Sequence, residues 1–229
     1  MAKGRGFDRP SLLQALEEGA GALGVELDAG QTGQLIDYLA LLAKWNAVYN
    51  LTAIRDPKQM LTHHVLDSLA AVPAFEAASQ VLDVGAGAGL PGMVLAIWAA
   101  RARPAMHIAM IDTVHKKTAF LNQVKAELNL GNVTIHTGRV EKLQADTLQS
   151  RKLFDVITSR AFADLGDFIA WSAHLLAPGG RFIAMKGVAT PAEGANLPPG
   201  WKIMEKRFLH VPGLGAGGHL VLVERAGAP

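Results

Sequence analysis

The stretch Asp83-Val84-Gly85-Ala86-Gly87-Ala88-Gly89-Leu90-Pro91-Gly92 decides the fold of this chain. It follows the apolar pair Val81-Leu82 and leads into the apolar run 93–100, so the pattern predicts a strand, a glycine-rich turn and a helix. Glycines at alternate positions allow a tight turn and bring the backbone close to a ligand at the N-terminus of the new helix. The stretch therefore predicts a loop that binds a nucleoside cofactor.

The glycine spacing alone leaves the class of cofactor open. Gly87-x-Gly89-x-x-Gly92 fits the fingerprint of dinucleotide-binding proteins. Asp83 favours a different ligand, because its carboxylate would lie beside a pyrophosphate and place two like charges in one pocket. S-adenosylmethionine carries a sulfonium and an ammonium group and no phosphate, so the acid and the glycines favour it over NAD. A turn that packs a helix on a strand without any ligand is the structural alternative.

Composition bounds the class of protein without naming its function. The chain has 229 residues, half of them hydrophobic, a formal net charge of +2 and no cysteine. These values exclude disulfides and thiolate metal sites, and they neither require nor exclude a nucleic-acid partner. The first ten residues lack the apolar core of a signal peptide, and the run 93–100 is shorter than the ~20 residues of a membrane span. We expect a soluble cytoplasmic monomer without membrane association.

The hydrophobic pattern divides the chain into two parts. Helical periodicity before residue 75 predicts an N-terminal helical cap, residues 1–75, and alternating strands and helices predict a cofactor-binding domain, residues 76–229. In the cap we expect a helix with Ser11 as its N-cap, then helices Thr32–Trp45 and Pro57–Val72. In the second part the expected helices are Pro91–Ala100, Lys116–Leu128, Val140–Leu148 and Leu165–Leu176.

Seven strand patterns alternate with these helices and predict a mostly parallel, doubly wound α/β sheet. The last two patterns are separated only by the glycine-rich loop 211–218, which suits an antiparallel hairpin at the end of the sheet. A parallel sheet that ends in such a hairpin is the layout of class I, Rossmann-like methyltransferases. The expected strands are Gln80–Val84, His107–Ile111, Val133–His136, Phe154–Thr158, Arg181–Met185, Lys202–His210 and His219–Glu224.

Two strand ends carry candidate ligand-binding residues. Asp112 closes the second strand, where an acid accepts hydrogen bonds from the ribose hydroxyls of a bound nucleoside; capping the helix near Lys116 is the structural alternative. Ser159-Arg160-Ala161-Phe162 ends the fourth strand and lacks the Asn/Asp-Pro-Pro-aromatic motif of enzymes that methylate exocyclic amines. Arg160 suits an anionic or carbonyl group and Phe162 suits a stacked base, with a surface ion pair and core packing as the alternatives.

Basic residues follow other strands at the same predicted edge. Arg139 and Lys186 come after the third and fifth strands, where a basic rim would hold phosphates, although such cations are often ordinary solvated charges. The segment His63-His64-x-x-Asp67 has two metal-binding residue types one helical turn apart, but no further cluster completes a ligand set. We expect no metal and interpret this segment as a polar helix edge that faces the cleft.

Taken together, these segments resemble the bacterial small-subunit (16S) ribosomal RNA guanine-N7 methyltransferases, also called glucose-inhibited division protein B. The likeness spans roughly residues 35–186. The resemblance implies that Gly85, Leu90, the Val140-Glu141 pair and Arg160 line the cofactor site, in addition to Asp83, Gly87 and Asp112. The matching stretches are Trp45-Asn46, Tyr49-Asn50-Leu51-Thr52, His64-x-Leu66-Asp67-Ser68, the glycine loop, Arg139-Val140-Glu141, Ser159-Arg160-Ala161-Phe162 and Lys186-Gly187.

The resemblance implies a reaction that needs no general base. Guanine N7 has an in-plane lone pair and no proton to lose, so catalysis would rest on orientation by Arg160 and Phe162. The substrate would be small-subunit ribosomal RNA, either naked or within an assembled or partly assembled subunit, with Arg139 and Lys186 on its phosphates. A small-molecule methyltransferase and a non-catalytic ribosome-binding protein are the alternatives, and a dehydrogenase is disfavoured by Asp83.

Overall fold

Seven strands form one sheet in the computed structural model, which describes residues 6–144, 152–160, 162, 164–187, 194, 196–215 and 217–227. The strand order is β3-β2-β1-β4-β5-β7-β6, in which the first five are parallel and β7 is antiparallel to both of its neighbours. The predicted parallel sheet with a terminal antiparallel hairpin is confirmed. The strands are β1 Gln80–Val84, β2 His107–Asp112, β3 Val133–Thr137, β4 Phe154–Arg160, β5 Leu176–Lys186, β6 Trp201–Phe208 and β7 His219–Arg225.

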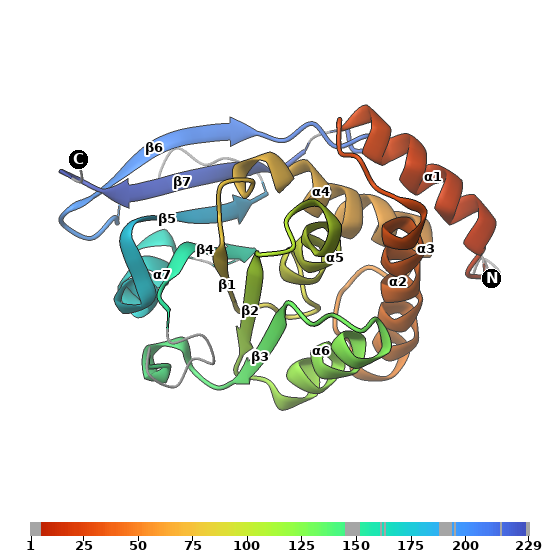
Figure 1. Ribbon diagram of the computed structural model, residues 1–229, viewed down its shortest axis with the longest axis horizontal. Coiled ribbons are helices and arrows are strands. Elements are labelled where there is room, and N and C mark those ends of the chain that lie inside the picture. Colours follow the sequence, from red (N-terminus) through yellow and green to blue (C-terminus); the bar gives the residue numbers. More distant parts are fainter. Residues whose placement is uncertain are drawn as a thin grey trace.

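Successive side chains of the central strands enter two different hydrophobic cores. Val81 of β1 lies in the larger core with residues of the N-terminal helices, whereas Leu82 lies in the smaller core with residues of α7. This alternation follows from the two-residue period of a strand and explains why buried parallel strands are apolar on both faces. Figure 1 shows α7 on one side of the sheet and α2, α5 and α6 on the other.

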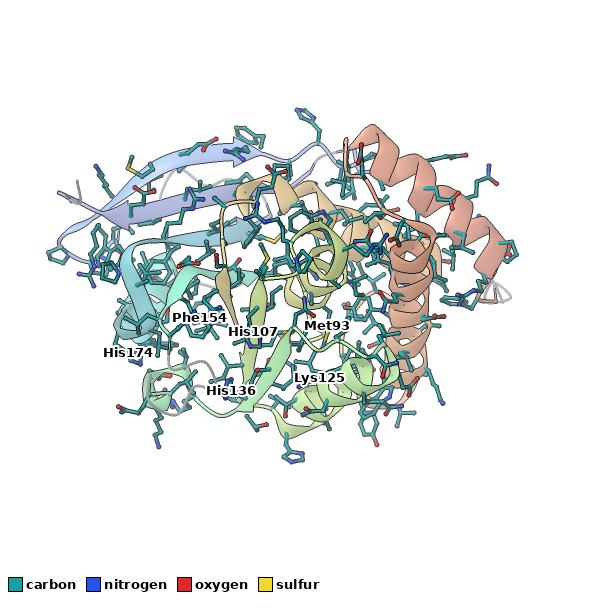
Figure 2. All side chains as sticks on the ribbon, viewed as in Figure 1. Met93, His107, Lys125, His136, Phe154 and His174 are labelled. Atoms are coloured by element: carbon teal, nitrogen blue, oxygen red, sulfur yellow. The ribbon has the colours of Figure 1, made fainter. Side chains whose placement is uncertain are left out.

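The labelled side chains of Figure 2 mark the same two layers. Phe154 and His174 lie on the α7 side, and Met93 and Lys125 lie on the side of α5 and α6. No described helix is long and apolar enough to cross a membrane. The helices are α1 Arg9–Ala22, α2 Ala29–Tyr49, α3 Pro57–Met60, α4 Asp67–Ala70, α5 Gly92–Ala102, α6 His115–Glu127 and α7 Leu165–Ser172, with 3₁₀ turns at Val72–Ala74, Val140–Lys142 and Ala173–Leu175.

Several predicted helix boundaries were wrong. The first helix begins earlier than predicted, because Asp8 rather than Ser11 is its N-cap and Pro10 fits the first turn. The segment predicted as a helix from Val140 to Leu148 forms only a 3₁₀ turn, Val140–Lys142, and its residues 145–148 lie outside the described part. The helix predicted to reach Leu176 ends at Ser172, whose hydroxyl donates to the Phe168 carbonyl, and Leu176 already begins β5.

The third N-terminal helix is not a regular α-helix. It starts as α3, continues as a π-helical segment from Leu61 to Leu66 (the π-turn) and returns to α-helix as α4. The predicted span of residues 57–72 is therefore helical up to Ala70, but its hydrogen-bond pattern changes in the middle. Segments of π-helix are rare and frequently occur at functional sites.

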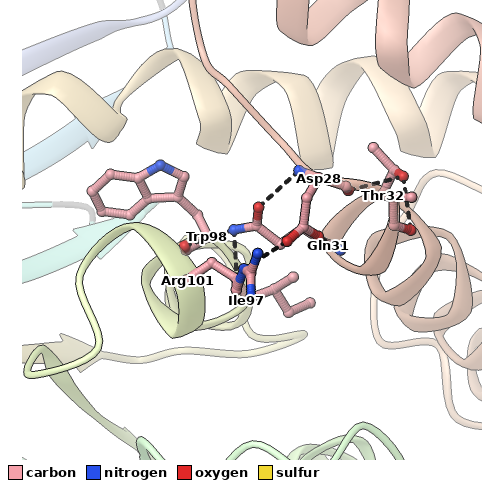
Figure 3. A network of polar contacts seen from close by, with 7 residues as sticks. Asp28, Gln31, Thr32, Ile97, Trp98 and Arg101 are labelled. Atoms are coloured by element: carbon pink, nitrogen blue, oxygen red, sulfur yellow. Dashed lines mark hydrogen bonds and ion pairs between the residues drawn. The ribbon is translucent and has the colours of Figure 1, made fainter.

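A polar network joins the start of α2 to the end of α5 (Figure 3). The Asp28 carboxylate accepts from the Gln31 backbone at 2.8 Å, and the Gln31 side-chain carbonyl accepts from the Asp28 backbone at 2.9 Å, which forms a capping box. The Gln31 amide donates to the carbonyls of Trp98 at 2.8 Å and Ile97 at 3.3 Å, and Arg101 pairs with Asp28 at 2.7 Å. This network fixes α2 against the helix that follows the glycine loop.

Candidate functional site

A cavity of about 520 Å³ lies beyond the carboxyl ends of β1, β2, β3 and β4. Open α/β sheets bind ligands at this edge, and the volume lies within the range of small-molecule and cofactor sites. The cavity is therefore the candidate cofactor site. It is lined by Val84, Gly85, Ile111, Asp112, Thr113, Val114, Lys117, Gly138, Arg139, Val140, Glu141, Ser159, Arg160, Phe162 and Trp171.

Two glycines leave room at the wall of this cavity. Gly85 has φ 69° and Gly138 has φ 149°, a region that other residues rarely adopt. A Cβ atom at either position would meet no protein atom within 4 Å, so the backbone here borders open space. Glycine therefore occupies the two positions at which the main chain has a positive φ and borders the cavity.

Asp112 lines the cavity and bonds the backbone on either side of it, while its role toward ribose hydroxyls stays a prediction. Its carboxylate accepts the Val114 amide at 2.9 Å at the start of α6 and the Gly87 amide at 2.9 Å across the glycine loop. Lys117 lies 3.6 Å from the same carboxylate. A carboxylate offers about four lone-pair sites, so the two amides leave acceptor capacity at the cavity.

Asp83 lies behind the glycine loop and not among the residues that line the cavity. Its Oδ2 accepts the Gly92 amide at 2.9 Å, and its Oδ1 has no hydrogen-bond partner within the described residues. Complete burial raises the pKa of Asp83 to about 8, against the opposing effects of the Gly92 amide and the Arg160 guanidinium. Gly87 and Leu90 likewise contribute no lining to the cavity.

Arg160, the last residue of β4, is held by three acceptors from the π-turn region. Its Nη1 donates to the His63 carbonyl at 3.0 Å and to Asp67 Oδ2 at 3.3 Å, and its Nη2 lies 3.2 Å from His64 Nδ1. Burial, and next the Arg160 charge, lower the pKa of His64 to about 4. Burial raises the pKa of Asp67 although Arg160 acts in the opposite direction. His64 is therefore a neutral acceptor at physiological pH.

A second hollow of about 280 Å³ shares Arg160 with the cofactor cavity. Lys186 reaches across to donate to the Phe162 carbonyl at 2.5 Å, so it lies at the sheet edge as predicted but already has an intramolecular partner. The hollow is lined by His63, Asp67, Arg160, Met185, Lys186, Gly187, Leu209, Leu214 and Gly218.

The remaining predicted site residues lie at the cavity rim. Arg139 pairs with Glu141 at 2.6 Å on the exposed 3₁₀ turn, and this hydrogen bond is the main cause that lowers the pKa of Glu141. Phe162 is half-buried and contacts Phe168 and Trp171, with ring centroids 5.4 and 5.6 Å apart. The Phe162 ring therefore packs against the smaller core and also borders the cavity, while its stacking on a base stays a prediction.

Sequence reasoning missed the contact of His64 with Arg160. His64 belongs to the motif His64-x-Leu66-Asp67-Ser68, but its partner Arg160 lies 96 residues away in the chain. Trp171 of the cavity wall was also missed, because an aromatic residue within a helix carries no sign of its exposure to a cavity. Among the described residues, no group of three or more His, Asp or Glu side chains could hold a metal ion.

The cavity suits S-adenosylmethionine chemically. Asp112 presents acceptors for ribose hydroxyls, and Ile111, Val114 and Val140 give one part of the wall an apolar surface for a base. The open space beside Gly85 and Gly138 admits a ligand close to the backbone.

Comparisons with known proteins agree with this architecture. A family model described as rRNA small subunit methyltransferase G matches residues 31–221. The ribosomal RNA small subunit methyltransferase G of Janthinobacterium sp. (strain Marseille) is 64% identical over 96% of this chain and 98% of its own length. The protein of the same name from Herminiimonas arsenicoxydans is 62% identical over 96% of this chain and 99% of its own. A putative O-methyltransferase from Klebsiella pneumoniae shares the fold with a TM-score of 0.55 and 13% identity, over 96% of this chain and 99% of that protein.

Proposed function

The chain belongs to the family of rRNA small subunit methyltransferase G, and from this premise we propose that it methylates N7 of a guanosine in small-subunit (16S) ribosomal RNA. It is an S-adenosylmethionine-dependent rRNA methyltransferase. The observation that carries the finer proposal is the placement of Arg160, which borders both the cofactor cavity and the second hollow. A guanine in that hollow would meet the cofactor across this side chain.

The chemistry of N7 fits the residues present. S-adenosylmethionine supplies an electrophilic methyl group, and N7 supplies a lone pair without losing a proton. The ionisable groups nearby, Asp112 and Glu141 of the cofactor cavity and His63 and Asp67 of the second hollow, are not needed as general bases, because N7 loses no proton. Orientation alone contributes roughly 7–11 kcal/mol in favourable reactions, so a site that only positions its reactants is sufficient.

We assign roles to the lining residues on this basis. Asp112 binds ribose hydroxyls, Val140 and Glu141 form the wall beside the base of the cofactor, and Gly85 admits the cofactor close to the backbone. Asp83, Gly87 and Leu90 support the glycine loop from the side away from the cavity. The Gly92 amide donates to Asp83, and the Gly87 amide donates to Asp112. Phe162 offers a partly exposed ring for stacking on the acceptor, and Arg160 holds the geometry between the two.

We also propose how the RNA reaches the site. N7 faces the deep, narrow groove of A-form RNA, so the target guanosine must be unpaired or flipped out. Arg139 and Lys186 contact phosphates around the cavity, and the helices within residues 1–75 act as a cap for the domain of residues 76–229. The enzyme is a cytoplasmic monomer that acts on the RNA alone or within an assembled or partly assembled subunit.

Methyl transfer in vitro tests the proposal. The purified chain is incubated with S-adenosylmethionine labelled in its methyl group and with small-subunit rRNA from a strain that lacks the corresponding enzyme. Naked RNA and intact small subunits serve as parallel substrates, and the nucleosides are then identified by mass mapping. We expect one labelled 7-methylguanosine. Label at another guanine atom, or label only in small molecules, would contradict the N7 assignment.

A further inference from the structure

The π-turn exposes a backbone acceptor that an α-helix would have used. The Asp67 amide bonds the carbonyls of His64 and Thr62, whereas in an α-helix it would bond the carbonyl of His63, four residues earlier. The His63 carbonyl instead accepts Nη1 of Arg160 at 3.0 Å. In the irregular helix the Asp67 amide thus leaves the His63 carbonyl, and Arg160 donates to this carbonyl.

Two side chains of the same helix also accept hydrogen bonds from the guanidinium. Asp67 Oδ2 lies 3.3 Å from Nη1, and His64 Nδ1 lies 3.2 Å from Nη2. Arginine has no lone pair to offer, so His64 Nδ1 must be the acceptor and the proton of the neutral ring must be on Nε2. That Nε2–H then donates to Thr52 Oγ1 at 2.9 Å.

This chain of bonds continues into helix α2. The Thr52 amide donates to the Asn46 side-chain carbonyl at 2.8 Å, and the Asn46 amide donates to the Ile54 carbonyl at 3.0 Å. His64 is 4% exposed and Asn46 is 2% exposed, whereas Thr52 and Asp67 are partly exposed, so the support of Arg160 is largely buried although Arg160 itself borders two cavities. Buried, fully bonded supports of this kind fix the orientation of a side chain at a site.

We propose that His64 and Asp67 are positioning residues for the methyl-transfer reaction, which hold the plane of the Arg160 guanidinium at the boundary between the cofactor cavity and the second hollow. The inference rests on the proposed function. A single ion pair would leave the long arginine side chain free to rotate, whereas two acceptors on Nη1 and a third on Nη2 fix the direction of the planar group. A small misplacement of reacting groups lowers a rate by up to about 100-fold.

A matched pair of substitutions at His64 tests the role. His64→Leu removes the acceptor, and His64→Asn keeps an oxygen on the atom equivalent to Cγ, where Nδ1 is attached. We expect His64→Leu to lower the single-turnover rate by about 10- to 100-fold. The Kd for S-adenosylhomocysteine should change by less than about threefold, and His64→Asn should recover most of the rate. Equal losses in both variants, or no loss in either, would overturn the proposal.

Ser68→Ala separates positioning from stability. Ser68 is fully buried in the same helix and donates to the His64 carbonyl at 2.7 Å, but it does not touch Arg160. We expect this control to lower the thermal unfolding temperature and to keep the wild-type rate. A rate loss in Ser68→Ala comparable to that of His64→Leu would show that helix stability alone explains the effect and would overturn the proposal.

The tautomer of His64 gives a readout that does not depend on activity. Nitrogen-15 chemical shifts of the wild-type protein at pH 7 should show a neutral ring with its proton on Nε2. The Arg160→Ala variant should lose this preference, since Nδ1 then has no donor. A proton on Nδ1 in the wild type would contradict the network. If the network is present but the wild type transfers no methyl group to rRNA, the proposed function fails instead.

Discussion

Two of the polar networks that join the helices before residue 75 to the α/β part differ in where they end. The network of Asp28 and Gln31 ends on main-chain carbonyls of α5, Ile97 and Trp98 (Figure 3). The network of Thr52, His64 and Asp67 ends on the Arg160 side chain at the cofactor cavity. Bonds that close on main-chain atoms stabilise the packing of helices, whereas bonds that close on a cavity side chain also fix the geometry of a site. We therefore expect damage to the first to appear as lost stability and damage to the second as lost rate.

The largest effect is expected from Arg160→Lys. Lysine keeps the charge but cannot donate at once to the three acceptors that surround the guanidinium, because its single ammonium lacks the planar fork. We expect the single-turnover rate of methyl transfer to fall by about 100-fold while the unfolding temperature changes little. A wild-type rate in this variant would show that charge alone is sufficient and that the network has no positioning role.

Asp112→Ala should weaken cofactor binding more than it weakens folding. The change removes acceptors that face the cavity, and hydrogen bonds that involve a charged group contribute roughly 1.5–3 kcal/mol. Calorimetry should therefore show a Kd for S-adenosylhomocysteine that is raised by about 10- to 100-fold, and the wild type should bind this ligand more tightly than NAD. An unchanged Kd would show that Asp112 does not bind the cofactor and serves only to accept the Val114 and Gly87 amides.

Gln31→Ala should produce the opposite pattern. Its loss leaves the carbonyls of Ile97 and Trp98 without their side-chain donor and removes one half of the capping box, which together costs roughly 1–3 kcal/mol. Denaturant unfolding should show this loss, with the single-turnover rate preserved. Gln14→Ala is the matched control, since Gln14 is exposed and its side chain donates to Glu18 within the same helix. A rate loss in Gln31→Ala would mean that the first network also acts on the site.

The smallest effects concern the basic rim. Arg139→Ala and Lys186→Ala should each weaken RNA binding and reduce the slope of log affinity against log salt by about one unit per lost phosphate contact. Arg101→Ala is the control, because Arg101 pairs with Asp28 in the first network and lies away from the cavity lining. Slopes equal to the control value would identify Arg139 and Lys186 as residues whose bonds to Glu141 and Phe162 are only structural.

Local patterns predicted the sheet but not the support of Arg160. The apolar strands, the glycine loop and the helix-free connection 211–218 each carry their structural consequence within a few residues, and the observed topology follows them. The π-turn has no such signal, and Arg160, which its groups bind, lies at the end of β4. The contacts of His64 and Asp67 with Arg160 exist only in the folded chain, so local sequence could not predict them.

The sequence also did not reveal which acidic residues beside the glycine loop line the cavity. Asp83 lies one residue before the end of β1 and Asp112 ends β2, yet only Asp112 lines the cavity. The Asp83 side chain turns back to accept the Gly92 amide. A Cβ atom at position 92 would lie 2.8 Å from the Asp83 carboxylate. Strand position alone does not reveal on which side of the loop a carboxylate lies.

The dependence of the methyl-transfer rate on pH tests the central claim most directly, which is that the site orients its reactants and removes no proton. The pKa of His64 is lowered to about 4, so above that value His64 stays a neutral acceptor for Arg160, and only below it does protonation remove the bond. We therefore predict that the single-turnover rate, at saturating S-adenosylmethionine and rRNA, does not rise tenfold per pH unit from pH 6 to pH 9, although Asp83, whose pKa burial raises to about 8, titrates behind the glycine loop within this interval. A rate that rises tenfold per pH unit across this interval would reveal a proton-abstracting residue and an acceptor atom other than N7.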